Sequence, residues 1–169
     1  MSQPETLVCS VLFLDLADYS KRSVADQIRL KQLFNAALAQ ALVQVSKRDR
    51  IVVDTGDGAA ITFPGDPESA LLVALGMLDH AEELPMRMGI NLGPVYRLSD
   101  LNGNENVIGD GINVAQRVMS FARSGQLLVS RSYYEVVTRM SGEYGKLFEK
   151  ADARTDNCLL NTSYAADEL

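Results

Sequence analysis

Residues 7–20 read LVCSVLFLDLADYS, an apolar run that ends in an acidic and polar turn. Apolar side chains continue from Leu7 to Leu14 with only small polar interruptions, which is typical of a strand covered on both faces and therefore central in its sheet. Asp15 ends the run, and a carboxylate there is unfavourable unless another group neutralises it. We expect this strand to deliver Asp15 to a functional site, with helix capping or turn formation as the alternative role of the carboxylate.

Helical and strand patterns follow one another along the rest of the chain. Apolar stripes at helical spacing, capping residues and turn dipeptides set the boundaries. The expected order is a helix capped by Ser23 with a stripe from Leu30 to Val45, a hairpin over 51–63, a helix from Pro67 to Ala81, a strand over 85–92, a helix over 110–122, a strand over 126–130 and a helix over 130–140.

This order predicts an α+β fold, a ferredoxin-like (βαββαβ) sandwich with helices on one face of a mainly antiparallel sheet and an additional C-terminal strand and helix. We expect the strand over 85–92 to end at Gly93-Pro94, residues 99–106 to form a loop, and Asp110 to cap its helix. A single domain is predicted over 1–169, with its core at about 7–140 and a weakly patterned tail at 141–169.

The composition narrows the classes of partner. The net charge of -6 argues against a broad nucleic-acid footprint, which needs clustered Lys and Arg. The N-terminus lacks the pattern of a signal peptide, and no apolar run approaches the roughly 18 residues of a membrane span. We therefore expect a cytoplasmic protein that binds neither nucleic acid nor membrane.

Two further segments carry polar residues at informative positions. Asp57 lies at the tip of the expected hairpin, within Thr55-Gly56-Asp57-Gly58, although Asp-Gly is also a common hairpin turn that needs no ligand. Asn113 and Arg117 lie one turn apart on the expected helix over 110–122, on a face offset from its apolar stripe. They point toward solvent, a ligand or another subunit, and a solvated polar face is the alternative interpretation.

Two familiar motifs are excluded by spacing. The segment that begins at Asp100 resembles a calcium-binding loop, but Glu105 stands where that loop needs glycine and Gly111 where it needs glutamate. Gly56 and Gly58 could begin a dinucleotide fingerprint, but the third glycine of that fingerprint falls at Ile61, within a strand.

Taken together, the three polar segments resemble those of the class III adenylate and guanylate cyclases. The shared features are the strand-end Phe13-Leu14-Asp15-Leu16, the hairpin Gly56-Asp57, and the stretch from Gly109 to Arg117 with Asn113, Ala115 and Arg117 at the family's spacing. Their order and surroundings agree from about Leu7 to Val137. The resemblance implies the class III nucleotidyl cyclase fold and formation of a 3′,5′-cyclic nucleotide and pyrophosphate from a nucleoside triphosphate, with ATP as the favoured substrate, for intracellular signalling.

The resemblance also implies roles for individual residues. Asp15, Asp57 and the backbone carbonyl of Leu16 would hold two Mg²⁺ or Mn²⁺ ions. Asn113 would orient the ribose, and Arg117 would stabilise charge on the α-phosphate. Nucleotide contacts are expected from the backbone N–H groups of the turn and from the two base-reading positions, namely Ala17, Asp18, Tyr19, Ser20, Val53 and Asn106.

In this family the metal carboxylates and the Asn/Arg pair come from different subunits, which implies a head-to-tail homodimer with shared sites. Val53 and Asn106 match neither the adenine-reading nor the guanine-reading pair, so the base stays open. The alternative is a catalytically weak or silent cyclase-fold module that dimerises and senses nucleotide. A different metal-dependent phosphotransferase on a related sheet is a third hypothesis.

Overall fold

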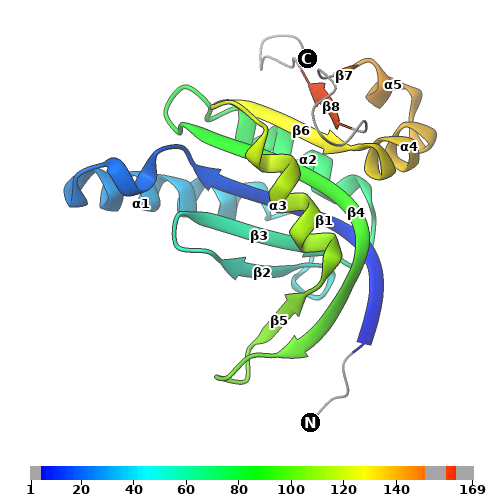
Figure 1. Ribbon diagram of the computed structural model, residues 1–169, viewed down its shortest axis with the longest axis horizontal. Helices are drawn as coiled ribbons and strands as arrows, with labels where there is room; N and C mark the ends of the chain where they lie inside the picture. Colours follow the sequence, from blue (N-terminus) through cyan, green and yellow to red (C-terminus); the bar gives the residue numbers. More distant parts are fainter. Residues whose placement is uncertain (1–4, 151–158, 163–169) are drawn as a thin grey trace.

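The computed structural model describes residues 5–150 and 159–162, which form an 8-stranded sheet flanked by helices (Figure 1). The strands are β1 (Glu5–Leu16), β2 (Ile51–Asp54), β3 (Gly58–Phe63), β4 (Met86–Ser99), β5 (Glu105–Ile108), β6 (Gln126–Ser130), β7 (Phe148–Lys150) and β8 (Leu159–Thr162). The α-helices are α1 (Val24–Ala41), α2 (Glu68–Leu78), α3 (Asp110–Ser120), α4 (Arg131–Met140) and α5 (Gly142–Gly145). Short 3-10 helices cover Tyr19–Lys21 and Lys47–Asp49.

The sheet order confirms the predicted fold class. Its path is β2-β3-β1-β4-β6-β8-β7, with β5 paired to β4 on a branch. The first four strands pair antiparallel, and together with α1 and α2 they give the βαββαβ arrangement. β6 then joins β4 in parallel, so the predicted C-terminal strand and helix extend this unit at one edge.

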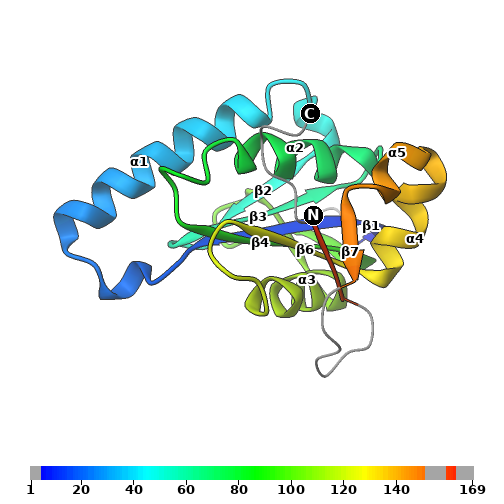
Figure 2. The same cartoon turned by 90° about the horizontal axis from the view of Figure 1, so that it is seen from above.

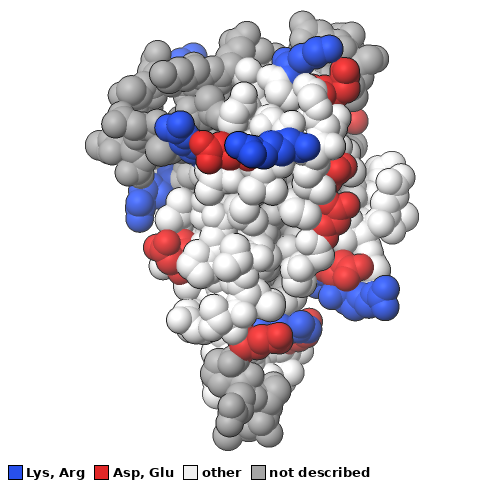
Figure 3. Space-filling view, turned by 90° about the vertical axis from the view of Figure 1, so that its right-hand side faces the viewer, with Lys and Arg blue, Asp and Glu red and all other residues white. Residues whose placement is uncertain are grey.

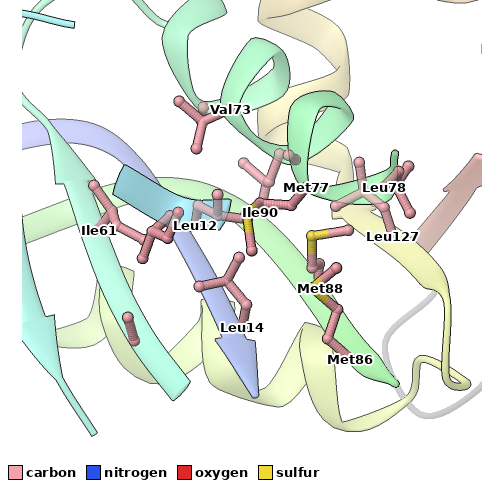
Figure 4. Packing of buried hydrophobic residues seen from close by; sticks show 14 of the residues in the cluster. Leu12, Leu14, Ile61, Val73, Met77, Leu78, Met86, Met88, Ile90 and Leu127 are labelled. Atoms are coloured by element: carbon pink, nitrogen blue, oxygen red, sulfur yellow. The ribbon is translucent and has the colours of Figure 1, made fainter. Parts of the chain in front are cut away.

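Alternate residues of β1 face two different hydrophobic cores. Leu12, Leu14 and Leu16 belong to the larger core, which is covered by α1, α2 and α4. Figure 4 shows Leu12 and Leu14 beside Ile90 and Met88 of β4, beneath α2. Val11 and Phe13 face the second core, which α3 covers. β1 is therefore buried on both faces, as its apolar run predicts.

The expectation that helices cover one face of the sheet is wrong, because α3 lies on the opposite face from α1 and α2 (Figure 2). The parallel pairing of β4 with β6 requires a crossover, and α3 is that crossover. Two glycines let α3 lie against β4. A Cβ on Gly89 would lie 2.4 Å from the Met119 nitrogen, and one on Gly111 would lie 2.8 Å from the Pro94 carbonyl oxygen.

Of the predicted helix caps, the one at Ser23 is confirmed and the one at Asp110 is not, while Ser130 forms a cap where only the start of a helix was expected. The Ser23 hydroxyl accepts a hydrogen bond from the Asp26 N–H, and Ser130 caps α4 through the Tyr133 N–H. The N-cap of α3 is Gly109 at φ 125°, a left-handed value that favours glycine, and Asp110 is already the first helical residue. The prediction that Asp110 caps this helix is therefore wrong.

β4 is longer than expected because it continues through Gly93-Pro94 to Ser99. Pro94 pairs with Val8 of β1 on one side, while on the other side β6 reaches only Ile90 and the pairing with β5 covers only Tyr96 to Ser99. A proline without an N–H is tolerated where one edge of a strand lacks a partner. The predicted loop over 99–106 is consequently shorter, and Asn106 lies in β5.

The weakly patterned tail adds strands to the sheet. β8 pairs antiparallel with β6, and β7 pairs with β8. Residues 1–4, 151–158 and 163–169 of the predicted domain lie outside the described part of the chain. Strands of three and four residues have little room for a period-2 pattern, which is why the sequence did not indicate these two.

The length of the described helices and the charges on the surface relate to the predictions about membrane and nucleic acid. In residues 5–150 and 159–162, no helix is both long and apolar enough to cross a membrane. On the face shown in Figure 3, Lys and Arg lie beside Asp and Glu and do not gather into a basic patch. The cytoplasmic location remains a prediction.

Candidate functional site

The end of β1 places Asp15 against a basic side chain. In the register of the sheet, Asp15 lies between Gly58 of β3 and Arg87 of β4. Arg87 Nε donates to Asp15 Oδ1 at 3.0 Å and Nη2 donates to Oδ2 at 2.7 Å. Asp15 is 8% exposed, so this bidentate pair supplies the neutralising group that its buried position requires.

The hairpin between β2 and β3 brings Asp57 to the same place. The Leu16 N–H donates to the Asp57 carbonyl oxygen at 2.8 Å, which joins the tip of the hairpin to the end of β1. A Cβ on Gly58 would lie 1.9 Å from the Leu14 carbonyl oxygen, so only glycine allows this approach. The Thr55 hydroxyl donates to Asp57 Oδ1 at 3.4 Å.

Arg87 is the common neighbour of three carboxylates. Its pKa is raised mainly by the hydrogen bond to Asp15, with smaller contributions from the charges of Asp15, Asp57 and Asp18. Arg87 is therefore hydrogen-bonded to Asp15 and lies within the electrostatic influence of Asp57 and Asp18. An oxygen-rich acidic group of this kind suits hard cations such as Mg²⁺ and Mn²⁺.

Sequence reasoning missed Arg87, although a signal was present. Its neighbours Met86 and Met88 are fully buried in the larger core, whereas Arg87 points to the other face of the sheet. A charged residue between two buried ones in an otherwise apolar strand indicates a specific partner. Arg87 Nη1 also donates to the Ser120 carbonyl oxygen at 3.4 Å, which connects the end of α3 to this site.

The turn after β1 differs from its predicted role at one position. The Ala17 N–H donates to the Pro85 carbonyl oxygen at 2.6 Å, so it is already engaged and the expectation that it contacts phosphate is corrected. Asp18 has φ 55°, a left-handed conformation, and Tyr19 and Ser20 begin the 3-10 helix. The expected phosphate contacts are thereby reduced to the N–H groups of Asp18, Tyr19 and Ser20.

Asn113 and Arg117 lie on the outer face of α3. Ala115 and Met119 pack on the sheet, and both Asn113 and Arg117 are exposed on the opposite side of the helix. Because 3.6 residues make one turn, these two side chains are neighbours that point away from β1. Within one chain they do not converge with Asp15 and Asp57.

The two predicted base-reading positions lie on neighbouring strands. Val53 of β2 is half-buried and sits opposite Ala60, while Asn106 of β5 accepts a hydrogen bond from the Val107 N–H at 2.8 Å. β2 and β5 approach each other in the fold. The structure thus places Val53 and Asn106 in one region, without indicating which base they would read.

A metal would have to share Asp15 with Arg87. No group of three or more His, Cys, Asp or Glu side chains is arranged to hold a metal among the described residues. Both oxygens of Asp15 accept from Arg87. The donor chemistry fits Mg²⁺ or Mn²⁺, and a cation would use the lone pairs of Asp15 that the guanidinium leaves open or would replace one of its hydrogen bonds. A cavity of about 530 Å³, which His80 helps to line, lies between α1 and α2, away from this site.

Comparisons with curated sequences identify distant relatives. The chain is 27% identical over 137 residues to an uncharacterized protein of Mycobacterium tuberculosis, covering 74% of this chain and 33% of that protein. It is 26% identical over 141 residues to a provisionally named adenylate cyclase 3 of Rhizobium meliloti, covering 77% and 23%. The chain thus spans a third or less of these relatives. No family model matches it.

Comparisons with solved structures give strong matches over nearly the whole chain. The catalytic core of a rhodopsin-guanylyl cyclase with converted specificity, in complex with ATPαS, matches with a TM-score of 0.70 at 20% identity, covering 98% of this chain and 100% of that one. A dimeric guanylyl cyclase domain from Blastocladiella emersonii gives 0.71 at 21%, covering 95% and 96%. An adenylyl cyclase of Pseudomonas aeruginosa gives 0.72 at 14%, covering 99% and 100%.

These identities are too low to transfer an activity, but the structural agreement extends from β1 through the C-terminal strands. It includes both adenylyl and guanylyl cyclases, so it confirms the resemblance seen in the three sequence segments at the level of the fold. The chain has the fold of the class III nucleotidyl cyclase catalytic domain.

Proposed function

We propose that this chain is a nucleotidyl cyclase catalytic domain. It converts a nucleoside triphosphate, with ATP as the favoured substrate, into a 3′,5′-cyclic nucleotide and pyrophosphate for intracellular signalling. The observation that carries the proposal is the convergence of Asp15 and Asp57 beside Arg87 at the end of β1, in a cyclase fold. A purely structural hairpin turn has no need of this acidic group.

The site residues fit divalent cations by their chemistry. Asp15, Asp57 and the Leu16 carbonyl would supply oxygen ligands for two Mg²⁺ or Mn²⁺ ions. Bound there, the ions would lower the pKa of the ribose 3′-hydroxyl and neutralise charge on the phosphates. The 3′-oxygen would form a bond to the α-phosphorus as the bond to the bridging oxygen of pyrophosphate breaks, and the hydroxyl proton would leave to solvent.

The chain's own groups would do the positioning. The N–H groups of Asp18, Tyr19 and Ser20 are proposed to contact phosphate oxygens, since the Ala17 N–H is already bonded to Pro85. Asn113 would orient the ribose. Arg117 would stabilise charge that develops on the α-phosphate, where a planar guanidinium can donate two hydrogen bonds at once.

A second copy of the chain completes this site in the proposal. Asn113 and Arg117 lie on the exposed face of α3, opposite the face that packs on the sheet, so this face is available to meet the carboxylates of another copy across an interface. A head-to-tail homodimer would place the outer face of α3 of one protomer over the end of β1 of its partner, which gives two shared sites. A monomer would then be inactive.

The test is an assay of purified protein with each of the four common nucleoside triphosphates in the presence of Mg²⁺ or Mn²⁺. We expect a cyclic nucleotide and pyrophosphate in equal amounts, with ATP as the best substrate. Asp57→Asn keeps the shape of the hairpin tip and should lower turnover at least a hundredfold, because it removes a charged ligand. Absence of a cyclic product from all four substrates, with folded dimers verified, would refute the enzymatic proposal.

A silent nucleotide-sensing module is the second candidate, and specific observations favour it. Arg87 holds both oxygens of Asp15, and Val53 cannot hydrogen-bond a base. In this case calorimetry would detect binding of a nucleoside triphosphate with no turnover. Turnover that Asp57→Asn abolishes would exclude the silent module.

A further inference from the structure

The face of α1 that looks toward the candidate site contacts two separate segments of it. Gln27 and Lys31 lie one helical turn apart on this face. Each makes hydrogen bonds to a different part of the site, and neither belongs to the segments that carry the predicted ligands. The inference below rests on the proposed function, because it concerns how the predicted metal site is positioned.

Lys31 bonds to both ends of the turn that carries Asp57. Its Nζ donates to Asp54 Oδ1 at 3.0 Å and to the Gly58 carbonyl oxygen at 3.4 Å. The Lys31 side chain is only 19% exposed and its Nζ lies 5.5 Å from the centre of the Phe34 ring, so the side chain is held in place. Lys31 therefore links the last residue of β2 to the first residue of β3.

Asp54 connects Lys31 to the backbone of the turn. The same Oδ1 accepts a hydrogen bond from the Gly56 N–H at 2.7 Å, and Gly56 has φ 88°. The pKa of Asp54 is lowered, first by this backbone hydrogen bond and also by Lys31, so the carboxylate is charged when it makes both contacts. The Lys31 ammonium, the Asp54 carboxylate and the Gly56 amide thus form one chain of hydrogen bonds.

The orientation of the Asp57 carboxylate depends on this backbone. The contact of Asp57 Oδ1 with the Thr55 hydroxyl is long, at 3.4 Å, and comes from within the turn itself. The backbone of Asp57 is fixed from one side by the Leu16 N–H, which belongs to β1. Lys31 acts from the other side, through Asp54 and Gly58.

Gln27 makes the corresponding contact with the turn after β1. Its Nε2 donates to the carbonyl oxygens of Tyr19 at 2.9 Å and of Arg22 at 3.2 Å. This turn contains the N–H groups that we propose to contact phosphate. One turn of α1 therefore holds both the phosphate-contacting turn and the hairpin with Asp57.

We propose that Gln27 and Lys31 are positioning residues, which use α1 as a rigid support to fix the Asp57 hairpin relative to the turn after β1. They do not touch a cation or substrate. Mutation of a side chain that orients a metal ligand commonly weakens metal binding by about 10- to 100-fold. A displacement of α1 would shift both the Asp57 hairpin and the turn after β1. A molecule that binds to α1 and moves it would therefore change the geometry of the site.

The test compares three variants of the full chain. Lys31→Met keeps the aliphatic stem over Phe34 but removes the ammonium, and Lys31→Arg restores a charged donor. Arg29→Met is the matched control, because Arg29 lies on the same helix, is largely exposed and pairs only with Asp26 among its described hydrogen bonds. Mn²⁺ affinity is measured by electron paramagnetic resonance without nucleotide, and amide hydrogen exchange is measured at Gly56.

We expect Lys31→Met to weaken Mn²⁺ binding about tenfold and to speed exchange of the Gly56 amide, with Lys31→Arg restoring both. Exchange in β6 should stay at the wild-type rate, which separates a local effect from loss of global stability. Wild-type Mn²⁺ affinity and wild-type Gly56 exchange in Lys31→Met would overturn the inference. If the wild-type chain binds no Mn²⁺, the proposed function fails, and Gly56 exchange alone then decides the positioning role.

Discussion

The end of β1 and the outer face of α3 hold the two halves of the candidate site, and they are built in opposite ways. At the end of β1, Asp15 is buried and both of its oxygens accept hydrogen bonds from Arg87. On α3, Asn113 and Arg117 are exposed on the side that faces away from the sheet. One half is supported inside the chain, while the other is presented to the surroundings.

This difference indicates what each half needs. The buried Asp15 carboxylate is held by Arg87 within its own chain, so substitutions there should affect both stability and ligand binding. Exposed residues on one face of a helix contribute little to stability, so substitutions there should affect function alone. We therefore predict two distinct classes of variant. A substitution at the end of β1 that leaves stability unchanged, or one on the outer face of α3 that lowers it, would contradict this distinction.

The largest expected effect is the loss of catalytic activity when Arg117, on the outer face of α3, is substituted. Arg117→Ala should lower kcat by about a hundredfold or more, because it removes charge stabilisation of the transition state, with little change in the melting temperature. Asp15→Ala should be equally inactive. Mixing the two inactive variants should recover about a quarter of wild-type activity, because half of the randomly assorted dimers would contain one intact site of two.

The control for this experiment is each variant mixed with itself, which should stay inactive. Sedimentation must show that the subunits exchange during mixing. If dimers exchange and no activity returns, the two halves of the site do not meet across an interface. Strong destabilisation of the Arg117→Ala chain would contradict the prediction that substitutions on the outer face of α3 affect function alone.

A smaller effect is expected on the stability of the β1 half. Arg87→Met leaves Asp15 buried without its partner and should lower the free energy of unfolding by about 2 kcal/mol, allowing for the partial exposure of the guanidinium. A cation can then take the place of the guanidinium, so Mn²⁺ should raise the melting temperature of Arg87→Met more than that of the wild type.

Urea denaturation and thermal melts with and without Mn²⁺ measure this difference. Lys146→Met removes an exposed ion pair with Glu143 and serves as the control, since exposed pairs contribute little. Equal stabilisation of Arg87→Met and wild type by Mn²⁺ would show that Arg87 and a cation do not compete for Asp15.

The sequence predicted most of the fold because the apolar patterns of its elements are strong. The unbroken run of β1, the DTGDG hairpin, and the helices starting near Ser23 and Ser130 all appear in the structure. The position of α3 on the second face was not predicted, because it depends on the parallel pairing of β4 with β6. That pairing is a contact between distant segments, which local periodicity does not report.

The candidate site was predicted only in part, for a similar reason. Asp15 and Asp57 could be found from their places at a strand end and a hairpin tip, and Asn113 and Arg117 from their helical offset. Arg87 could not be assigned a partner from sequence, since Asp15 and Arg87 meet only through the register of β1 with β4. Lys31 of α1 and Asp54 of β2 are likewise distant in the sequence and meet only in the folded chain. The roles of all these residues remain predictions.

Near pH 9 the smallest expected effect concerns the core beneath α3, and it reports whether that helix stays docked. Cys9 of β1 is buried on this side of the sheet, and burial raises the pKa of its thiol to about 11. In the unfolded chain the thiol ionises near its usual pKa of about 8.5, so the unfolded state loses its proton first as the pH rises. Stability is therefore full below about pH 8.5 and should fall by up to about 1.4 kcal/mol per pH unit between there and pH 11.

Cys9→Ala should remove this contribution, so its stability should fall less steeply than that of the wild type over the same window. Tyr133, whose pKa burial also raises, remains in both proteins and sets the common background at higher pH. Urea denaturation at pH 8, 9 and 10 gives the comparison. Parallel curves for the two proteins would mean that water reaches the core under α3, and that α3 is not the firmly docked support from which its outer face presents Asn113 and Arg117 to a partner.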